Sequence, residues 1–469
     1  MKLPVALLAA LALALPLRAA ELSADALARL IAGRDATALG AAAQPALEVY
    51  ARKVTESWAG YDARIGTPLR QWAAVEVDAA RGETVFYPFS GPDFPTLHLL
   101  HPGASRYILV AIQNANLPPD LTRVDAASLQ GYLERMHLRL DQYARLGFFR
   151  TDDLNRDAAR GGLLVGVTDQ LMGFASRIGY EVASVEPIRL RADGSDVEPV
   201  PGAPRDAAAW RSVRLTLKSA GRSVTLDYVR GDLSDAGLQA SPPWKAFIEA
   251  AARHRTVFKA ASHLPQQPQF SLIRAAVLAR APSIVQDETG IDYGLLATAY
   301  DVTLYGKFDR AHRLFSATHN QALAAAYASR DDVRPLGFRV GYEKRLGSSV
   351  QVAVRREVQD AAALERRVAA SLERYAARPR VVYVSHGQAG TPELRAWLEA
   401  VSAKLPAAGG ASRVVSIMLD RSGAVVDASV DRGVDKGVGD SVRRLQRLPV
   451  PPASVIGRAD MVVLTMNLK

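Results

Sequence analysis

Residues 258–296 read FKAASHLPQQPQFSLIRAAVLARAPSIVQDETGIDYGLL, and signals for secondary structure are denser here than elsewhere in the chain. Apolar residues at helical spacing over 270–279 predict an amphipathic helix, and Pro282 is expected to end it. The apolar run 283–286 then predicts a short strand, and the polar segment 287–292 predicts a loop. A strand that follows a helix in this way is typical of an α/β sheet.

The residues before this stretch continue the alternation of strands and helices. Strands are predicted at 84–89 and 106–113, where β-branched and aromatic residues dominate. Apolar residues at helical spacing predict a helix at 129–146, and residues 213–229 are expected to form a hairpin. We therefore expect an α/β domain over residues 71–347, with a mixed sheet and helices on both of its faces.

The first residues have the features of an export signal. MKLPVALLAALALALPLRA, residues 1–19, has a lone Lys2, an apolar run over 3–17 and small residues where a peptidase could cut. The run is too short to span a bilayer comfortably. We expect a cleaved signal peptide, a periplasmic protein without a transmembrane segment, and a short helical arm over residues 20–70. An uncleaved N-terminal anchor helix is the alternative.

Charge and cysteine content exclude several classes of chemistry. The chain of 469 residues contains no cysteine, so it has no disulfide framework, thiol nucleophile or lipid-attachment cysteine. The formal charge is +10, from 58 Lys and Arg against 48 Asp and Glu. The basic residues are scattered among acidic ones, which is typical of a solvated surface. Weak attraction to anionic envelope polymers is the alternative, and we expect no nucleic-acid partner.

Two polar loops follow predicted strands. SGPD at 90–93 follows the first strand, and QDETGID at 286–292 includes the end of a later one. Loops at the carboxyl ends of strands are where α/β proteins place their ligands. If this domain has a ligand site, we expect it to include the following residues: Ser90, Gly91, Asp93, Gln286, Asp287, Glu288 and Tyr293.

Neither loop carries a complete catalytic or cofactor motif. The order of elements resembles the sheet of class I methyltransferases, in which SGPD would stand at the nucleotide-binding turn, but a nucleotide fingerprint needs several glycines. The acids over 287–292 lack the spacing of a calcium loop, and no zinc motif, G-x-S-x-G or P-loop occurs. We therefore predict no cofactor and no metal, and we assign no catalytic residue.

Two stretches also resemble segments of a family of uncharacterised secreted bacterial proteins. In that family YPFSGPD-like and QDxxGIxY-like stretches recur, which correspond here to residues 84–93 and 258–290. The resemblance covers residues 72–342 and carries no known activity. It implies that this region is one domain.

A linker is predicted to begin near Gly347. Residues 348–379 are predicted to be a charged linker helix with a narrow apolar stripe, which Pro379 ends. Beyond it, a helix is expected at 392–404, a hairpin that turns at 420–423, a basic helix at 440–448, and a closing strand.

This order resembles the C-terminal domain of the TonB and TolA energy-transducer families. The matching residues are Asp420, Gly423, Val425, Val430, Leu445 and residues 449–452. The family's tyrosine-proline segment before the hairpin and its long proline-rich spacer are absent. The resemblance implies a small α+β domain over residues 380–469, in which strand 461–468 pairs antiparallel within the sheet. We expect this domain to fold alone, with a core that includes Ile417, Leu419, Val425 and Val463 beneath the helices of Trp397 and Leu445.

Two functions remain open. The favoured hypothesis is a non-catalytic envelope protein whose C-terminal sheet edge pairs with a strand of a partner protein. The alternative is a small-ligand-binding protein or enzyme, with a pocket at the strand ends of a degenerate Rossmann- or methyltransferase-like domain.

Overall fold

The structure is a computed structural model of the chain. It describes residues 21–78, 80–149, 163–164, 166–203, 210–309, 320–341, 348–357, 361–376, 381–385, 391–405, 413–430, 441–442, 444–457 and 460–468. The predicted signal peptide at residues 1–19 lies outside the described residues.

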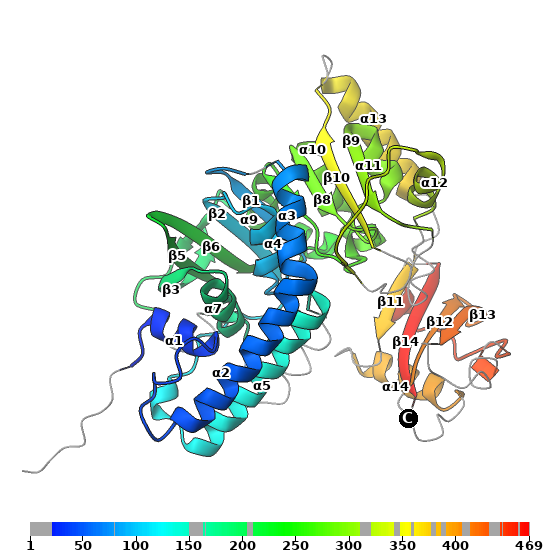
Figure 1. Cartoon of the computed structure of the whole chain (residues 1–469). Helices are drawn as coiled ribbons and strands as arrows, with labels where there is room; N and C mark the ends of the chain where they lie inside the picture. Colours follow the sequence, from blue (N-terminus) through cyan, green and yellow to red (C-terminus); the bar gives the residue numbers. More distant parts are fainter. Residues whose placement is uncertain are drawn as a thin grey trace, which may run out of the picture.

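A large mixed sheet forms the centre of the structure (Figure 1). Within the described residues its strand order is β4-β3-β5-β6-β2-β1-β7-β8-β10-β9. The strands are β1 Thr84–Pro88, β2 Arg106–Ala111, β3 Glu181–Leu190, β4 Val197–Pro199, β5 Val213–Ser219, β6 Arg222–Arg230, β7 Arg255–Val257, β8 Ser283–Gln286, β9 Tyr300–Gly306 and β10 Ser349–Arg355.

The middle of this sheet is parallel and its flanks contain antiparallel pairs. Strands β6, β2, β1, β7 and β8 pair parallel with one another, in that order. Numbered among themselves along the chain, they have the order 3-2-1-4-5, which Rossmann-type sheets share. Antiparallel pairing of β5 with β6 extends one side, and antiparallel pairing of β10 with β8 and β9 extends the other.

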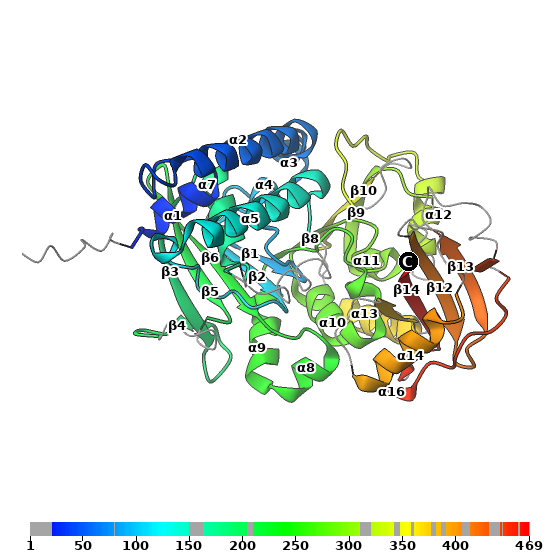
Figure 2. The same ribbon diagram turned by 90° about the horizontal axis from the view of Figure 1, so that it is seen from below.

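Helices cover both faces of the sheet, as Figure 2 shows. The first face carries α1 Ala24–Ile31, α2 Gln44–Tyr61, α3 Thr67–Glu76, α4 Phe94–Leu100, α5 Ala126–Leu146 and α7 Thr168–Arg177. The second face carries α8 Asp235–Ala240, α9 Pro242–Ala251, α10 Ser271–Arg280, α11 Tyr293–Ala299, α12 Gln321–Ser329 and α13 Ala361–Ala376.

The helices on both faces of the sheet explain why the sequences of its central strands are almost entirely apolar. In β1, Val85 and Tyr87 contribute to the core on the first face, while Phe86 between them contributes to the core on the second. Successive side chains of a strand point to opposite faces, so a strand covered on both sides needs apolar residues at every position. The mixed sheet with helices on both faces, predicted from the sequence, is confirmed.

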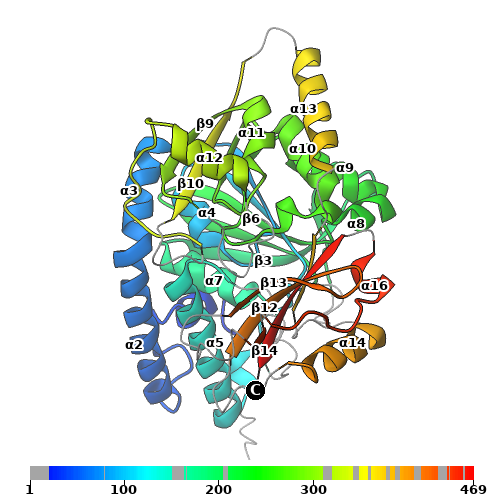
Figure 3. The ribbon, with the colours of Figure 1, turned by 90° about the vertical axis from the view of Figure 1, so that its right-hand side faces the viewer.

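Two predicted boundaries differ from the structure. The arm at 20–70 is helical, but Tyr50 and Tyr61 are buried in the core of the first face, so these helices belong to the α/β layers. The predicted linker at 348–379 is wrong in its first part, because β10 lies between β8 and β9 in the large sheet. In its second part, α13 lies beside α10 and α11 (Figure 3). The partners of β10 are distant in sequence, and a local pattern does not reveal them.

A second sheet of four described strands follows, in the order β11-β14-β12-β13. Its elements are β11 Val381–Ser385, α14 Pro392–Ser402, β12 Arg413–Asp420, β13 Val425–Val430, α16 Ala453–Ile456 and β14 Met461–Leu468. Strand β14 pairs antiparallel with β12, as predicted, and parallel with β11.

The turn between β12 and β13 forms as its sequence predicts. Asp420 Oδ1 accepts hydrogen bonds from the backbone N–H groups of Ser422 and Ala424, at 2.8 and 2.9 Å. Gly423 has φ of 81°, and a Cβ atom at this position would lie 2.4 Å from the carbonyl oxygen of Leu448. Only glycine fits here, because the left-handed backbone and the close carbonyl both exclude a side chain.

The apolar core of the second sheet contains the predicted residues with one exception, Val463. Ile417 and Leu419 are fully buried in a cluster with Trp397, and Val425 and Leu445 contact its margin. Val463 pairs with Met418, whereas Val462 and Leu464 pair with Leu419 and Ile417. The prediction for Val463 is wrong by one position, because Val462 and Leu464 belong to the core cluster instead. A shift of one residue along a strand moves a side chain to the other face of the sheet.

The predicted basic helix at 440–448 is also only partly described. Ser441 and Val442 are helical, whereas residues 444–448 are not, and Arg447 instead forms a β-bridge with Ala424. Positions 440 and 443 lie outside the described residues. In residues 444–448, backbone pairing beside the hairpin overrides the helical propensity of the basic segment.

Candidate functional site

The large sheet has a switch point between β1 and β7. After β1 the chain enters α4 on the first face, whereas after β7 it enters α10 on the second face. Strands β1 and β7 are parallel neighbours, so their connections diverge at their carboxyl ends. In open α/β sheets, ligands bind in the crevice beside such a point. The predicted residues of the 90–93 loop lie here.

The backbone at this point is strained. Phe89, Ala261 and His263 have φ of 60°, 60° and 55°, in the left-handed region that non-glycine residues rarely occupy. They are three of the five non-glycine residues with positive φ in the described part of the chain. Backbone strain of this kind gathers at functional sites, where the surrounding structure holds it in place.

A buried ion pair joins the two strand ends. Asp93 Oδ2 lies 3.3 Å from Lys259 Nζ, and both side chains are almost inaccessible to solvent. The other oxygen, Asp93 Oδ1, accepts a hydrogen bond of 3.0 Å from the backbone N–H of Phe149. Burial raises the pKa of Asp93 to about 6, although the Lys259 ammonium opposes the shift.

Sequence reasoning missed Lys259. A signal for it was present, because this lysine directly follows the apolar residues Val257 and Phe258, at the carboxyl end of a strand. A charged group that ends a buried strand needs a charged partner nearby. The rings of Phe89 and Phe258, stacked with centroids 6.4 Å apart, bring the same two strand ends together.

Asp287 stabilises loops of the protein itself. Its Oδ2 accepts a hydrogen bond of 2.8 Å from the N–H of Ala261, which holds the strained segment after β7. Its Oδ1 accepts hydrogen bonds from the N–H and hydroxyl of Thr289, at 2.9 and 2.6 Å. Burial raises the pKa of Asp287, and these hydrogen bonds act against the increase.

The remaining predicted polar residues near the strand ends also bond to the protein. Ser90 donates its hydroxyl to the carbonyl oxygen of Val110, at 3.3 Å. Gln286 Nε2 donates to the carbonyl oxygen of Ile291, and Gln286 Oε1 accepts from the N–H of the same residue, each at 2.8 Å. Glu288 Oε2 accepts a hydrogen bond of 2.6 Å from the Ser349 hydroxyl. Gly91 is buried and has φ of 58°, which suits the turn that follows β1.

Tyr293 lies apart from the other predicted residues. It is the first residue of α11, and its hydroxyl accepts a hydrogen bond of 3.3 Å from Arg330 Nη1. Together with Tyr300 and Arg356 it lines a separate pocket of about 280 Å³. The structure therefore brings Asp93 and Asp287 to one segment, 258–263, and places Tyr293 elsewhere.

No protein-family model, curated protein or solved structure matches the chain. The resemblances to the TonB and TolA families, to class I methyltransferases and to secreted bacterial proteins stay predictions. In the described part of the chain, no group of three or more His, Asp or Glu side chains is arranged to hold a metal ion. Over the same residues, no helix combines the length and apolar character that crossing a bilayer requires.

Proposed function

We propose that the protein is a non-catalytic protein of the bacterial envelope, and that it binds a partner strand at the edge of its C-terminal sheet. The observation that carries this proposal is the position of β13. This strand is the last of its sheet among the described strands, and it lies on the side away from the large sheet (Figures 1 and 2). A strand at a sheet edge offers backbone N–H and C=O groups to another chain.

Among the described residues, a backbone hydrogen bond covers the beginning of the β13 edge. The N–H of Val425 donates to the carbonyl oxygen of Gln446 at 3.0 Å, which covers the beginning of the strand. A β-bulge follows, because Met418 pairs with Asp427 and leaves Val426 without a partner across the ladder. Val426 is 55% exposed. We place the partner strand at this bulge, beside Val426.

The strand ends of the large sheet support a non-catalytic role. Asp93 is paired with Lys259, and Asp287 accepts three hydrogen bonds from its own chain. A general acid or base must reach the proton that it transfers, and these carboxylates are enclosed by the protein. The predicted resemblance to the C-terminal domain of the TonB and TolA families adds support, because the edge of such a small sheet can pair with a partner strand.

The alternative function has one observation in its favour. The 3-2-1-4-5 order of the parallel strands, with strained backbone at its switch point, is the arrangement in which Rossmann-type sheets bind nucleotides. Against it stand the burial of Lys259 and Asp287 and the bonds of both side chains within the chain itself. We therefore rank a ligand site at the strand ends second.

Export is the first part of the proposal to test. We expect the mature protein to begin near Ala20, because the small residues Ala19 and Ala20 follow an apolar run of signal-peptide length. The measurement is the intact mass of protein recovered from the periplasm of a producing bacterium. Protein that keeps its leader and sediments with the membrane would contradict the proposal.

Edge pairing is the second part to test. A photo-crosslinking amino acid at Val426 is expected to yield one discrete adduct in cells, because a partner strand would lie next to this position. The matched control carries the same amino acid at Val75, which is 81% exposed on α3 of the large domain. The adducts are compared by mass on denaturing gels. The absence of an adduct at position 426, or the same adducts at both positions, would refute the proposed edge.

A further inference from the structure

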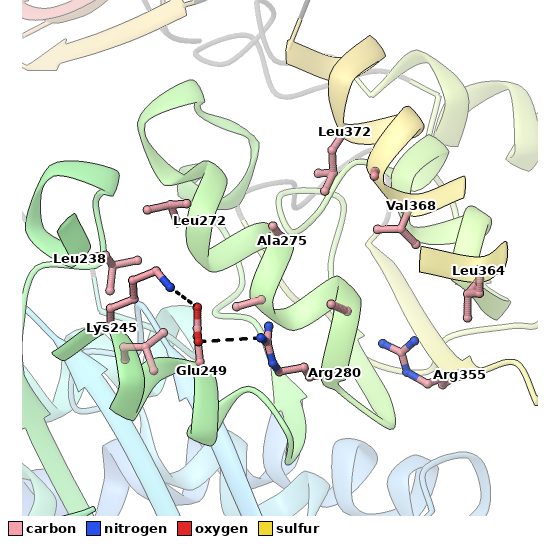
Figure 4. Close-up of a pocket in the computed structure, with 14 residues that line it drawn as sticks. Leu238, Lys245, Glu249, Leu272, Ala275, Arg280, Arg355, Leu364, Val368 and Leu372 are labelled. Atoms are coloured by element: carbon pink, nitrogen blue, oxygen red, sulfur yellow. Dashed lines mark hydrogen bonds and ion pairs between the residues drawn. The ribbon is translucent and has the colours of Figure 1, made fainter. Parts of the chain in front are cut away.

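An apolar groove runs between four helices on the second face of the large sheet (Figure 4). Its volume is about 290 Å³, and it is open to solvent. Helices α8 and α9 contribute Leu238 and Ile248, α10 contributes Leu272 and three alanines, and α13 contributes further aliphatic residues. Those on α13 are Leu364, Val368, Ala369 and Leu372.

Charged side chains lie along one edge of the groove, below the aliphatic ones in the view of Figure 4. Glu249 forms an ion pair of 2.5 Å with Lys245. Arg280 lies 3.8 Å from the other oxygen of Glu249, which is beyond hydrogen-bond distance. Arg280 is about one third exposed, so its guanidinium is accessible from the groove.

Arg355 provides a second guanidinium at this edge. It donates hydrogen bonds to the carbonyl oxygens of Leu278 and Ala281 at the end of α10, and to the Tyr300 hydroxyl. These bonds hold the guanidinium in place beside the groove. The charged residues among those that line the groove are thus three cations and one carboxylate, which leaves an excess of positive charge.

We propose that this groove binds an amphiphile with a carboxylate head and an alkyl chain of medium length. The aliphatic side chains of α10 and α13 match the alkyl chain, and Arg280 matches the carboxylate, because guanidinium forms paired hydrogen bonds with carboxylates. A volume of about 290 Å³ lies near the lower limit for small-molecule sites, which favours a chain shorter than that of a membrane lipid. The site is independent of the proposed edge pairing.

The test is calorimetric titration of the full-length mature protein with decanoate at pH 8, below the concentration at which micelles form. We expect saturable binding with one site, and binding at least about tenfold weaker for decanol and for decyltrimethylammonium, because neither pairs with a guanidinium. Shortening the chain from decanoate to octanoate is expected to weaken binding by up to about fourfold for each methylene that leaves the groove.

Four variants distinguish the contribution of the ligand's carboxylate to binding from that of its alkyl chain. Arg280→Gln is expected to lower decanoate affinity to that of decanol and to leave decanol unchanged. Glu249→Gln should tighten decanoate binding several-fold, since a competing carboxylate is removed. Ala279→Trp, at an exposed position of the groove, should weaken both ligands by filling the space. Arg52→Gln, an exposed position on α2, is the matched control and should change nothing.

Three results would overturn the site. The first is no saturable binding of decanoate by a protein whose thermal unfolding is normal. The second is equal affinity for decanoate and decyltrimethylammonium, or a preference for the carboxylate that survives Arg280→Gln. The third is binding to phosphatidylglycerol vesicles without binding to free decanoate, which would identify a basic surface for membranes instead of a groove for a single amphiphile.

Discussion

Lys259→Met is expected to lower the free energy of unfolding by about 3 to 5 kcal/mol at pH 8, the range for breaking a buried ion pair from one side. The substitution leaves the Asp93 carboxylate enclosed at the switch point without the ammonium that lies 3.3 Å away in the native protein. The lost pairing is not replaced by water, because both side chains are buried. The measurement is urea unfolding followed by circular dichroism.

The same variant should show a specific pH dependence. Burial raises the pKa of Asp93 from 3.8 to about 6 in the folded protein, so the folded state binds this proton more tightly than the unfolded state. The stabilisation from protonated Asp93 is complete below the unfolded pKa and is lost as the pH rises through the folded pKa. Without Lys259 the folded pKa rises further. The cost of Lys259→Met is therefore expected to be small at pH 5 and large at pH 8.

Two further variants serve as controls for this prediction. Asp93→Asn combined with Lys259→Met should recover part of the lost stability, because no charge then remains buried. Lys245→Met removes the lysine of a partly exposed ion pair on α9 and should cost less than about 1 kcal/mol. If Lys259→Met is as stable as the parent at pH 8, or equally costly at pH 5 and pH 8, the pair does not have the role that we assign to it.

Ile417→Asp is expected to destabilise the C-terminal sheet by about 4 kcal/mol or more. Ile417 is fully buried at the centre of the cluster that contains Trp397, and it pairs with the buried Leu464 of β14. An aspartate here loses the apolar contacts and brings a carboxylate into a core that offers it no cation among the described cluster residues. Thermal unfolding of residues 380–469, expressed alone, is the measurement.

The parent fragment must first unfold cooperatively for that comparison. We expect this, because the four strands and α14 form their own apolar cluster within about ninety residues. Val426→Asp is the matched control, since Val426 is on the next strand but mostly exposed, and it should change stability by less than about 0.5 kcal/mol. An Ile417→Asp fragment with the melting temperature of the parent would show that the strand faces the other way.

The elements that could be predicted from the sequence are those whose conformation is set by neighbouring residues in the chain. Val85, Phe86 and Tyr87 are β-branched or aromatic residues in a row, which favours a strand whatever the partners are. Gly147 ends α5 in the left-handed conformation, with φ of 78°, at the position where the helical spacing stops. The turn at 420–423 follows from the hydrogen bonds of Asp420 to its own backbone.

The candidate site was predicted in part for the same reason. The strand ends at Ser90 and Gln286 could be located, because apolar runs end there and polar residues begin. The arrangement of their side chains could not be predicted. Asp93 meets Lys259 only because β1 and β7 are neighbours in the sheet, and these two residues are separated in sequence by more than half of the large domain. The groove of Figure 4 was not predicted at all, since α13 reaches α10 only through tertiary packing.

The sequence by itself determined that the chain forms an α/β layer structure followed by a smaller sheet, because strand, helix and turn propensities act within a few residues. Only the tertiary structure decided that β10 belongs to the large sheet, that Val463 faces away from the core of Ile417, and that Asp93 is paired with a lysine. These features depend on strand register and on contacts between distant segments. Such contacts are selected by the free energy of the whole fold and leave no local pattern.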